Sequence, residues 1–98
     1  MMALSDDLLV ELKDKLQVTW DDEATNRHLL ILINNGLSYF NKLCGTQLAF
    51  EDYSSERELL MERCRYDWNN ALSDFEDNYH KELSRLILQV ALDEFVEG

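Results

Sequence analysis

Apolar side chains recur every three or four residues along most of the chain, a spacing that places them on one face of an α-helix. The first such segment starts at Ser5, whose hydroxyl can cap a helix, and its apolar face comprises Leu8, Leu9, Leu12 and Leu16. Because the chain has no proline and only three glycines, few residues can end strands or form hairpins. The pattern predicts an all-α protein built as a small helical bundle.

The longest apolar segment predicts a central helix over residues 22–43, capped by Asp21 and ended by Gly45. At 1.5 Å per residue this helix is roughly 33 Å long. Its two apolar stripes are Leu30, Ile33, Leu37, Phe40 and Cys44, and Leu29, Leu32, Gly36, Tyr39 and Leu43. One stripe can pack against the other helices of the domain, and we expect the second to need cover from outside the monomer.

The second half of the chain contains an extended connection or short strand over residues 46–53 and then further helical segments. Ser55 and Glu58 have the spacing of a capping box, which predicts the start of a third helix. Beyond it the apolar spacing suits one unbroken helix or two. We favour a break within residues 74–78, with Asn78 capping a fourth helix.

The length of 98 residues predicts a single domain, with a core over residues 5–68 and a C-terminal helical arm over residues 69–98. The arm is too long to pack entirely against the central helix, so we expect part of it to project.

The chain has a hydrophobic content of 46% but a formal net charge of −11. This acidic balance argues against tight nucleic-acid binding, which depends on Lys and Arg at phosphates. The longest apolar run is far shorter than the roughly 18 residues of a membrane span, so no membrane partner is expected. The first residues lack the basic region and cleavage site of a secretory signal, and we expect an intracellular site of synthesis.

Candidate catalytic or metal-binding residues are few. Cys44, Cys64, His28 and His80 lack the closely spaced partners typical of zinc sites, and the two cysteines are expected to be buried thiols rather than a disulfide. Neighbouring acids on a helix point in different directions and do not converge on one atom. There is no glycine-rich phosphate loop. We therefore expect no enzyme activity, cofactor or metal.

Aromatic residues are concentrated in the polar segment RYDWNNALSDFEDNYHKEL, where a lone small domain offers little to cover them. Aromatic side chains among charges are typical of protein interfaces. The predicted interface residues are Tyr66, Trp68, Phe75 and Tyr79, with Leu86, Ile87 and Val90 as a supporting apolar stripe.

Over residues 8–94 the chain resembles the small helical head-tail connector proteins of tailed bacteriophages, also called head-completion or adaptor proteins. The matching pieces are LLVELKDKLQV, TWDDEATNRHL, LSYFNKLCGTQL and RYDWNNALSDFEDNYHKELSRLILQVALDE. The most distinctive part is the cluster over residues 69–76.

The resemblance implies a ring of about a dozen copies in the virion neck, made in the bacterial host cytoplasm and docked on the portal protein. Its C-terminal region would reach the portal, other surfaces would receive the next connector or tail-completion protein, and DNA would pass through the channel without specific binding. The contacts in such a ring are heterologous, so each copy needs two different faces. The alternative is a small acidic regulatory binding protein, including one that mimics DNA.

Overall fold

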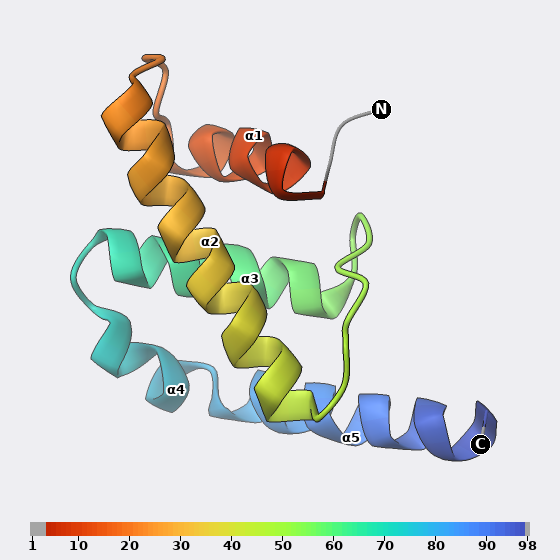
Figure 1. The fold of residues 1–98 in the computed structure, drawn as a ribbon. Helices are drawn as coiled ribbons and strands as arrows, with labels where there is room; N and C mark the ends of the chain where they lie inside the picture. Colours follow the sequence, from red (N-terminus) through yellow and green to blue (C-terminus); the bar gives the residue numbers. More distant parts are fainter. Residues whose placement is uncertain (1–3, 98) are drawn as a thin grey trace.

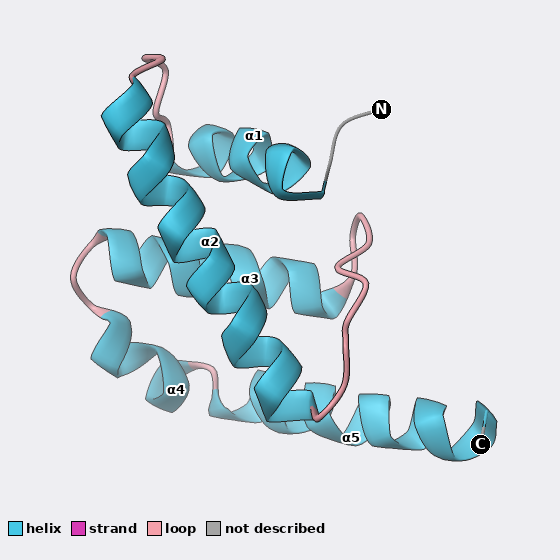
Figure 2. Ribbon diagram, in the orientation of Figure 1, coloured by secondary structure: helices cyan, strands magenta, loops and turns pink. Residues whose placement is uncertain are grey.

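The computed structural model describes residues 4–97, and every regular element in this part of the chain is helical (Figures 1 and 2). The elements are α1 (Leu4–Leu16), α2 (Glu23–Cys44), α3 (Ser55–Trp68), the single-turn 3-10 helix η1 (Leu72–Asp74), α4 (Phe75–Asn78) and α5 (His80–Glu97). The long helix α2 contacts α1, α3 and α5, and Figure 1 shows it crossing diagonally over α3 and α5 with α1 beside its first half. The predicted all-α bundle is confirmed, and residues 46–53 form an irregular connection without a strand.

The central helix begins one residue later than predicted. Its cap is Asp22, whose carboxylate accepts hydrogen bonds of 2.9 Å from both the backbone N–H and the hydroxyl of Thr25. Asp21 accepts a 2.8 Å hydrogen bond from the Asn26 side chain instead. At the other end Gly45 adopts φ 68°, the left-handed conformation that was predicted to end the helix.

The predicted capping box at the start of α3 is wrong by one residue. Ser54 is the cap, and its hydroxyl accepts a 3.2 Å hydrogen bond from the backbone N–H of Arg57. The guanidinium of Arg57 is buried, where it binds Glu11 of α1 at 3.0 Å and the backbone carbonyl of Phe50 at 3.0 Å. Arg57 thus links α1, α3 and the connection before it.

The helical segments after α3 are broken, as expected, but the chain turns earlier than predicted. The turn follows Trp68, where Asn70 adopts φ 59°, a left-handed conformation that asparagine tolerates well. Asn78 ends α4, and its side-chain amide donates a 2.9 Å hydrogen bond to the hydroxyl of Tyr66. Its predicted role as the cap of α5 is therefore replaced by a contact with α3.

Both apolar stripes of α2 are covered within the monomer, so the expectation that the second stripe needs outside cover is wrong. On α2, Leu29, Leu32, Ile33, Gly36 and Phe40 are buried. The remaining stripe residues are partly buried against the same core. The core also includes Phe75, Leu83 and Leu86, so it extends past the predicted boundary at residue 68 and into α5.

Candidate functional site

The seven predicted interface residues differ widely in exposure. Phe75 and Leu86 are 1% and 4% exposed, so a folded monomer does not offer them to a partner. The partly buried ones, which pack against the core, are Tyr66, Trp68, Tyr79 and Val90. Ile87 is 40% exposed. The expectation that a lone domain leaves this aromatic set uncovered is therefore wrong.

The aromatic residues form an internal cluster because α4 turns Phe75 toward α2. The Phe75 ring stacks on Tyr79 with ring centroids 5.1 Å apart and meets Tyr66 and Phe40 edge-on at 5.8 and 6.3 Å. Trp68 lies against His28 of α2 at 5.7 Å. Edge-on and offset contacts of this kind stabilise a core beyond the burial of area alone. The cluster therefore joins α2, α3 and α4, together with Tyr79 just before α5.

Glu62 of α3 is the centre of a polar network beside this cluster. Its carboxylate pairs with Lys15 at 2.7 Å and with Arg65 at 2.6 Å, and it accepts a 2.9 Å hydrogen bond from the hydroxyl of Tyr79. Burial by itself would raise the pKa of Glu62, but the three hydrogen bonds outweigh it and lower the pKa to about 2. Glu62 is thus a satisfied structural carboxylate.

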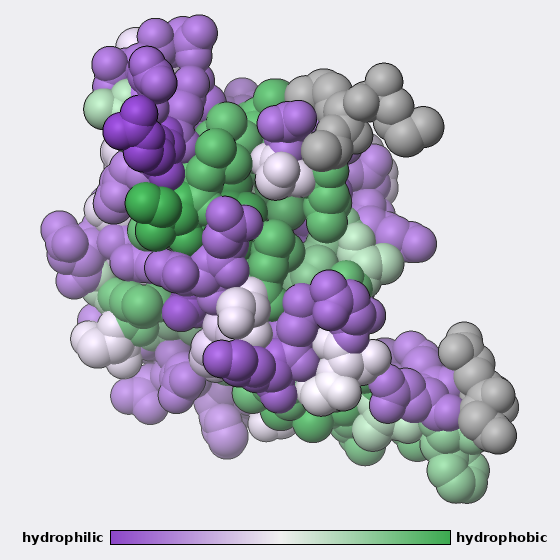
Figure 3. Space-filling view, viewed as in Figure 1, coloured by the Kyte–Doolittle hydropathy of each residue, from purple (hydrophilic) through white to green (hydrophobic). Residues whose placement is uncertain are grey.

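The largest exposed apolar side chains of α5 lie on its outer side and toward its end. We call Ile87, Leu88, Leu92 and Phe95 the α5 end face; their exposed fractions are 40, 61, 50 and 83%. Leu83 and Leu86, on the other side of the helix from Leu88, Leu92 and Phe95, are buried in the core, and Ile87 lies one turn after Leu83 at the edge of the buried side. Figure 1 shows the last turns of α5 extending beyond the bundle, and Figure 3 shows apolar atoms at this end of the molecule.

The predicted interface included Ile87 of this face but not Leu88, Leu92 or Phe95. Their signal was present, because Leu88, Leu92 and Phe95 have the i, i+4, i+7 spacing of a single helical stripe. A second stripe on a helix whose first stripe already faces the core indicates a surface that the monomer does not use.

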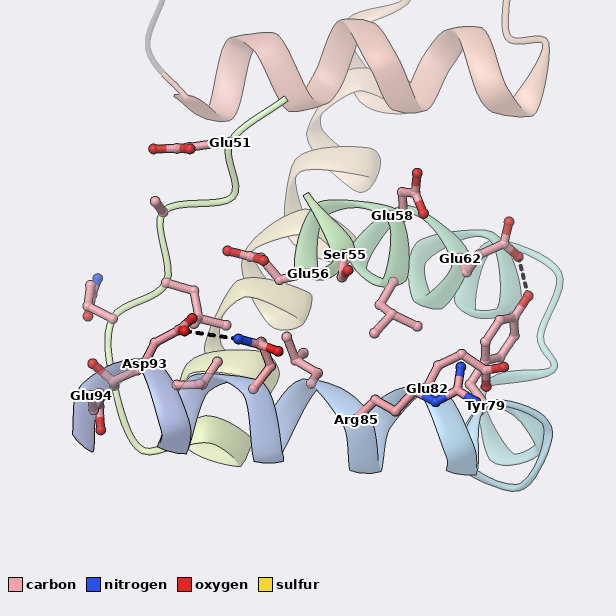
Figure 4. Close-up of a pocket in the computed structure, with 18 residues that line it drawn as sticks. Glu51, Ser55, Glu56, Glu58, Glu62, Tyr79, Glu82, Arg85, Asp93 and Glu94 are labelled. Carbon is pink, nitrogen blue, oxygen red and sulfur yellow. Dashed lines mark hydrogen bonds between the residues drawn. The ribbon is translucent and has the colours of Figure 1, made fainter. Parts of the chain in front are cut away.

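A groove of about 890 Å³ runs between α3, α5 and the connection over residues 46–51. We call it the acidic groove, because Arg85 is the one basic residue among the described residues that line it. Its carboxylates are Glu51, Glu56, Glu58, Glu62, Glu82, Asp93 and Glu94 (Figure 4). Its apolar lining consists of Leu48, Ala49, Leu59, Leu86 and Val90.

Within residues 4–97, no three His, Cys, Asp or Glu side chains are grouped so that they could hold a metal ion. Cys64 is buried and Cys44 is partly buried, and both are free thiols. Burial raises the pKa of the Cys64 thiol to about 12, which makes it a poor nucleophile. His28 and His80 are exposed. Across the described helices, none combines the length and the apolar character needed to cross a bilayer.

Compared with known protein families, with characterised proteins and with solved structures, the chain matches none of them. The two surfaces that stand out on the described residues are the α5 end face and the acidic groove.

Proposed function

We propose that the protein is a non-enzymatic structural adaptor of the phage neck, which assembles as a ring on the portal protein and joins the DNA-filled head to the tail. The proposal follows the resemblance of the chain to head-tail connector proteins. The observation that carries it is the α5 end face, a group of exposed apolar side chains on the projecting end of a helix.

Burial of the α5 end face by a partner would contribute substantially to the free energy of binding. Fully burying a leucine or phenylalanine side chain is worth about 1.5 to 3 kcal/mol relative to leaving it exposed. These four side chains, three of them on one helical stripe and all partly exposed in the monomer, offer several kcal/mol to a partner that covers them. Contiguous apolar surface of this kind is a mark of an interaction site in soluble proteins.

Further exposed apolar side chains lie on the first half of α2 and in the connection before it. Trp20, in the connection before α2, is 52% exposed, and Ile31 of α2 is 51% exposed. Figure 1 places that connection and the start of α2 far from the end of α5. Two separate faces of different composition suit the heterologous contacts of a ring in which each copy also touches a platform.

A regulatory protein that mimics DNA is the alternative function for a small acidic chain. Such a protein acts through its carboxylates and has no need of an apolar helix end. The α5 end face therefore favours the adaptor.

The test is co-sedimentation of the protein with the portal protein encoded by the same genome. Wild-type protein is expected to sediment with the portal, and the double variant Leu92→Gln/Phe95→Gln is expected to remain in the supernatant with unchanged helicity by circular dichroism. Val10→Gln is the matched control, because Val10 is 58% exposed on α1, away from the α5 end face. Equal sedimentation of the double variant and the wild type would refute the proposal.

A further inference from the structure

The acidic groove lies on a different side of α5 from the α5 end face. Glu82, Gln89 and Asp93 form its α5 wall, and none of the end-face residues lines it. Glu56 of α3 lies on the opposite wall, and the connection over residues 46–51 closes one end (Figure 4). The groove is therefore a separate surface that the adaptor proposal leaves without a role.

The carboxylates of the groove are mostly unneutralised. Glu62 already pairs with Lys15 and Arg65. The other six carboxylates form no ion pair with any described residue. Six unpaired carboxylates that line one groove repel one another, and a ligand carrying positive charge relieves that repulsion.

The floor of the groove is apolar. Its accessible apolar surface comes from Leu48 and Val90, which are partly buried, whereas Leu59 and Leu86 also line the groove but are only 6% and 4% exposed. An occupant must therefore bring apolar side chains as well as cations. A volume of about 890 Å³ lies within the range of well-formed binding sites and accommodates a few side chains of a peptide segment.

A second copy of the chain fits the groove poorly. Each copy has a formal net charge of −11, and of its nine basic residues five already form ion pairs: Lys13, Lys15, Arg27, Arg57 and Arg65. Nucleic acid is repelled by the same carboxylates. Charge complementarity therefore selects a different protein.

We propose that the acidic groove binds a basic amphipathic segment of a partner protein, with the segment's apolar side chains on Leu48 and Val90 of the floor and its Lys or Arg side chains facing the α3 and α5 walls. This inference goes beyond the adaptor proposal and does not depend on it.

The experiment measures fluorescence anisotropy of a labelled synthetic helical peptide of leucine and lysine at about 0.15 M salt, near physiological ionic strength. A peptide of the same composition, scrambled to lose its apolar face, separates groove binding from general attraction to an acidic protein. Glu82→Gln/Asp93→Asn removes two wall carboxylates. Asp6→Asn/Asp77→Asn is the matched control, because it changes net charge equally at exposed positions outside the groove.

The amphipathic peptide is expected to bind the wild type, and the groove variant is expected to bind it about fivefold more weakly, as two exposed charge pairs allow. The control variant should stay within about twofold of the wild type. Equal weakening by both variants, or equal binding of the scrambled peptide, would overturn the inference.

Methyl NMR of the wild type with the same peptide locates the contact. Shifts at Leu59 and Val90 support the groove. Shifts confined to Leu88 and Leu92 place the peptide on the α5 end face and overturn the inference, without bearing on the portal experiment.

Discussion

The hydroxyl of Tyr79 donates a 2.9 Å hydrogen bond to Glu62, and this contact ties the start of α5 to α3. The Tyr79 ring also stacks on Phe75. The first turns of α5 are therefore fixed to the bundle while its last turns leave it. A helix held in this way presents its end face in a set direction, which lowers the ordering cost of binding.

Replacing Tyr79 by phenylalanine keeps the stacked ring and removes the hydrogen bond. We expect Tyr79→Phe to lower the free energy of unfolding by about 1 kcal/mol, the usual net worth of such a bond. Urea denaturation measures the change. Tyr53→Phe is the control, since Tyr53 is 96% exposed, and it should leave stability unaltered. A loss no greater than that of the control would show that the hydrogen bond does not hold α5.

Acid is expected to destabilise the protein partly through Glu62. Its pKa is lowered from 4.5 to about 2 in the folded chain, so the unfolded chain binds the proton more readily between these values. The stabilisation is complete above about pH 4.5 and is lost as the pH falls toward 2. As the pH is lowered from 4.5 to 2, the unfolding free energy should fall less steeply for Glu62→Gln than for the wild type. Glu58→Gln controls for net charge, and identical slopes for wild type and Glu62→Gln would contradict the assignment.

Gly36 marks the closest approach of α2 to α3. A Cβ at this position would overlap the side chain of Leu60, which is fully buried. Overpacking costs about 1 to 3 kcal/mol, and the better helix propensity of alanine returns about 0.5 to 1 kcal/mol. We expect Gly36→Ala to destabilise by about 1 kcal/mol in thermal or urea unfolding. Ser38→Ala is the control, because it lies at an exposed position of the same helix and should not lower stability. An increase in the stability of Gly36→Ala would mean that α2 and α3 are not in close contact at this position.

Phe75 was predicted to lie in an interface, but in the structure it lies in the core. Because its ring is 1% exposed, Phe75→Ala should cost about 3 to 5 kcal/mol in unfolding free energy. Any loss of portal binding by this variant would then accompany loss of folding, unlike the loss expected for Leu92→Gln/Phe95→Gln. If urea denaturation gave Phe75→Ala the same unfolding free energy as the wild type, the burial of Phe75 in the core would be contradicted.

The helices were predictable because their apolar spacing survives in the sequence, but two helix starts were misplaced by one residue. In each case two adjacent residues of the same type compete for the cap, Asp21 with Asp22 and Ser54 with Ser55. Local pattern cannot separate them. Tertiary contacts can, as when Arg57 reaches Glu11 on α1.

The interface was harder to predict than the fold. Periodicity identifies an apolar stripe but not what covers it. The second stripe of α2 was assigned to a partner, whereas α3 supplies cover at Gly36, which lies against Leu60, and at Tyr39, which lies under Arg63. Phe75 stands among charged residues in the sequence, and only the turn through Asn70 and α4 brings it inside. The stripe of Leu88, Leu92 and Phe95 could have been found by asking which α5 residues remain once Leu83 and Leu86 face the core.

The most direct test of the adaptor proposal is electron microscopy of portal rings incubated with the wild type or with Leu88→Gln/Leu92→Gln/Phe95→Gln. The proposal predicts an added ring of density on portals mixed with the wild type and bare portals with the variant. Bare portals with the wild type, or the same added ring with both proteins, would contradict it.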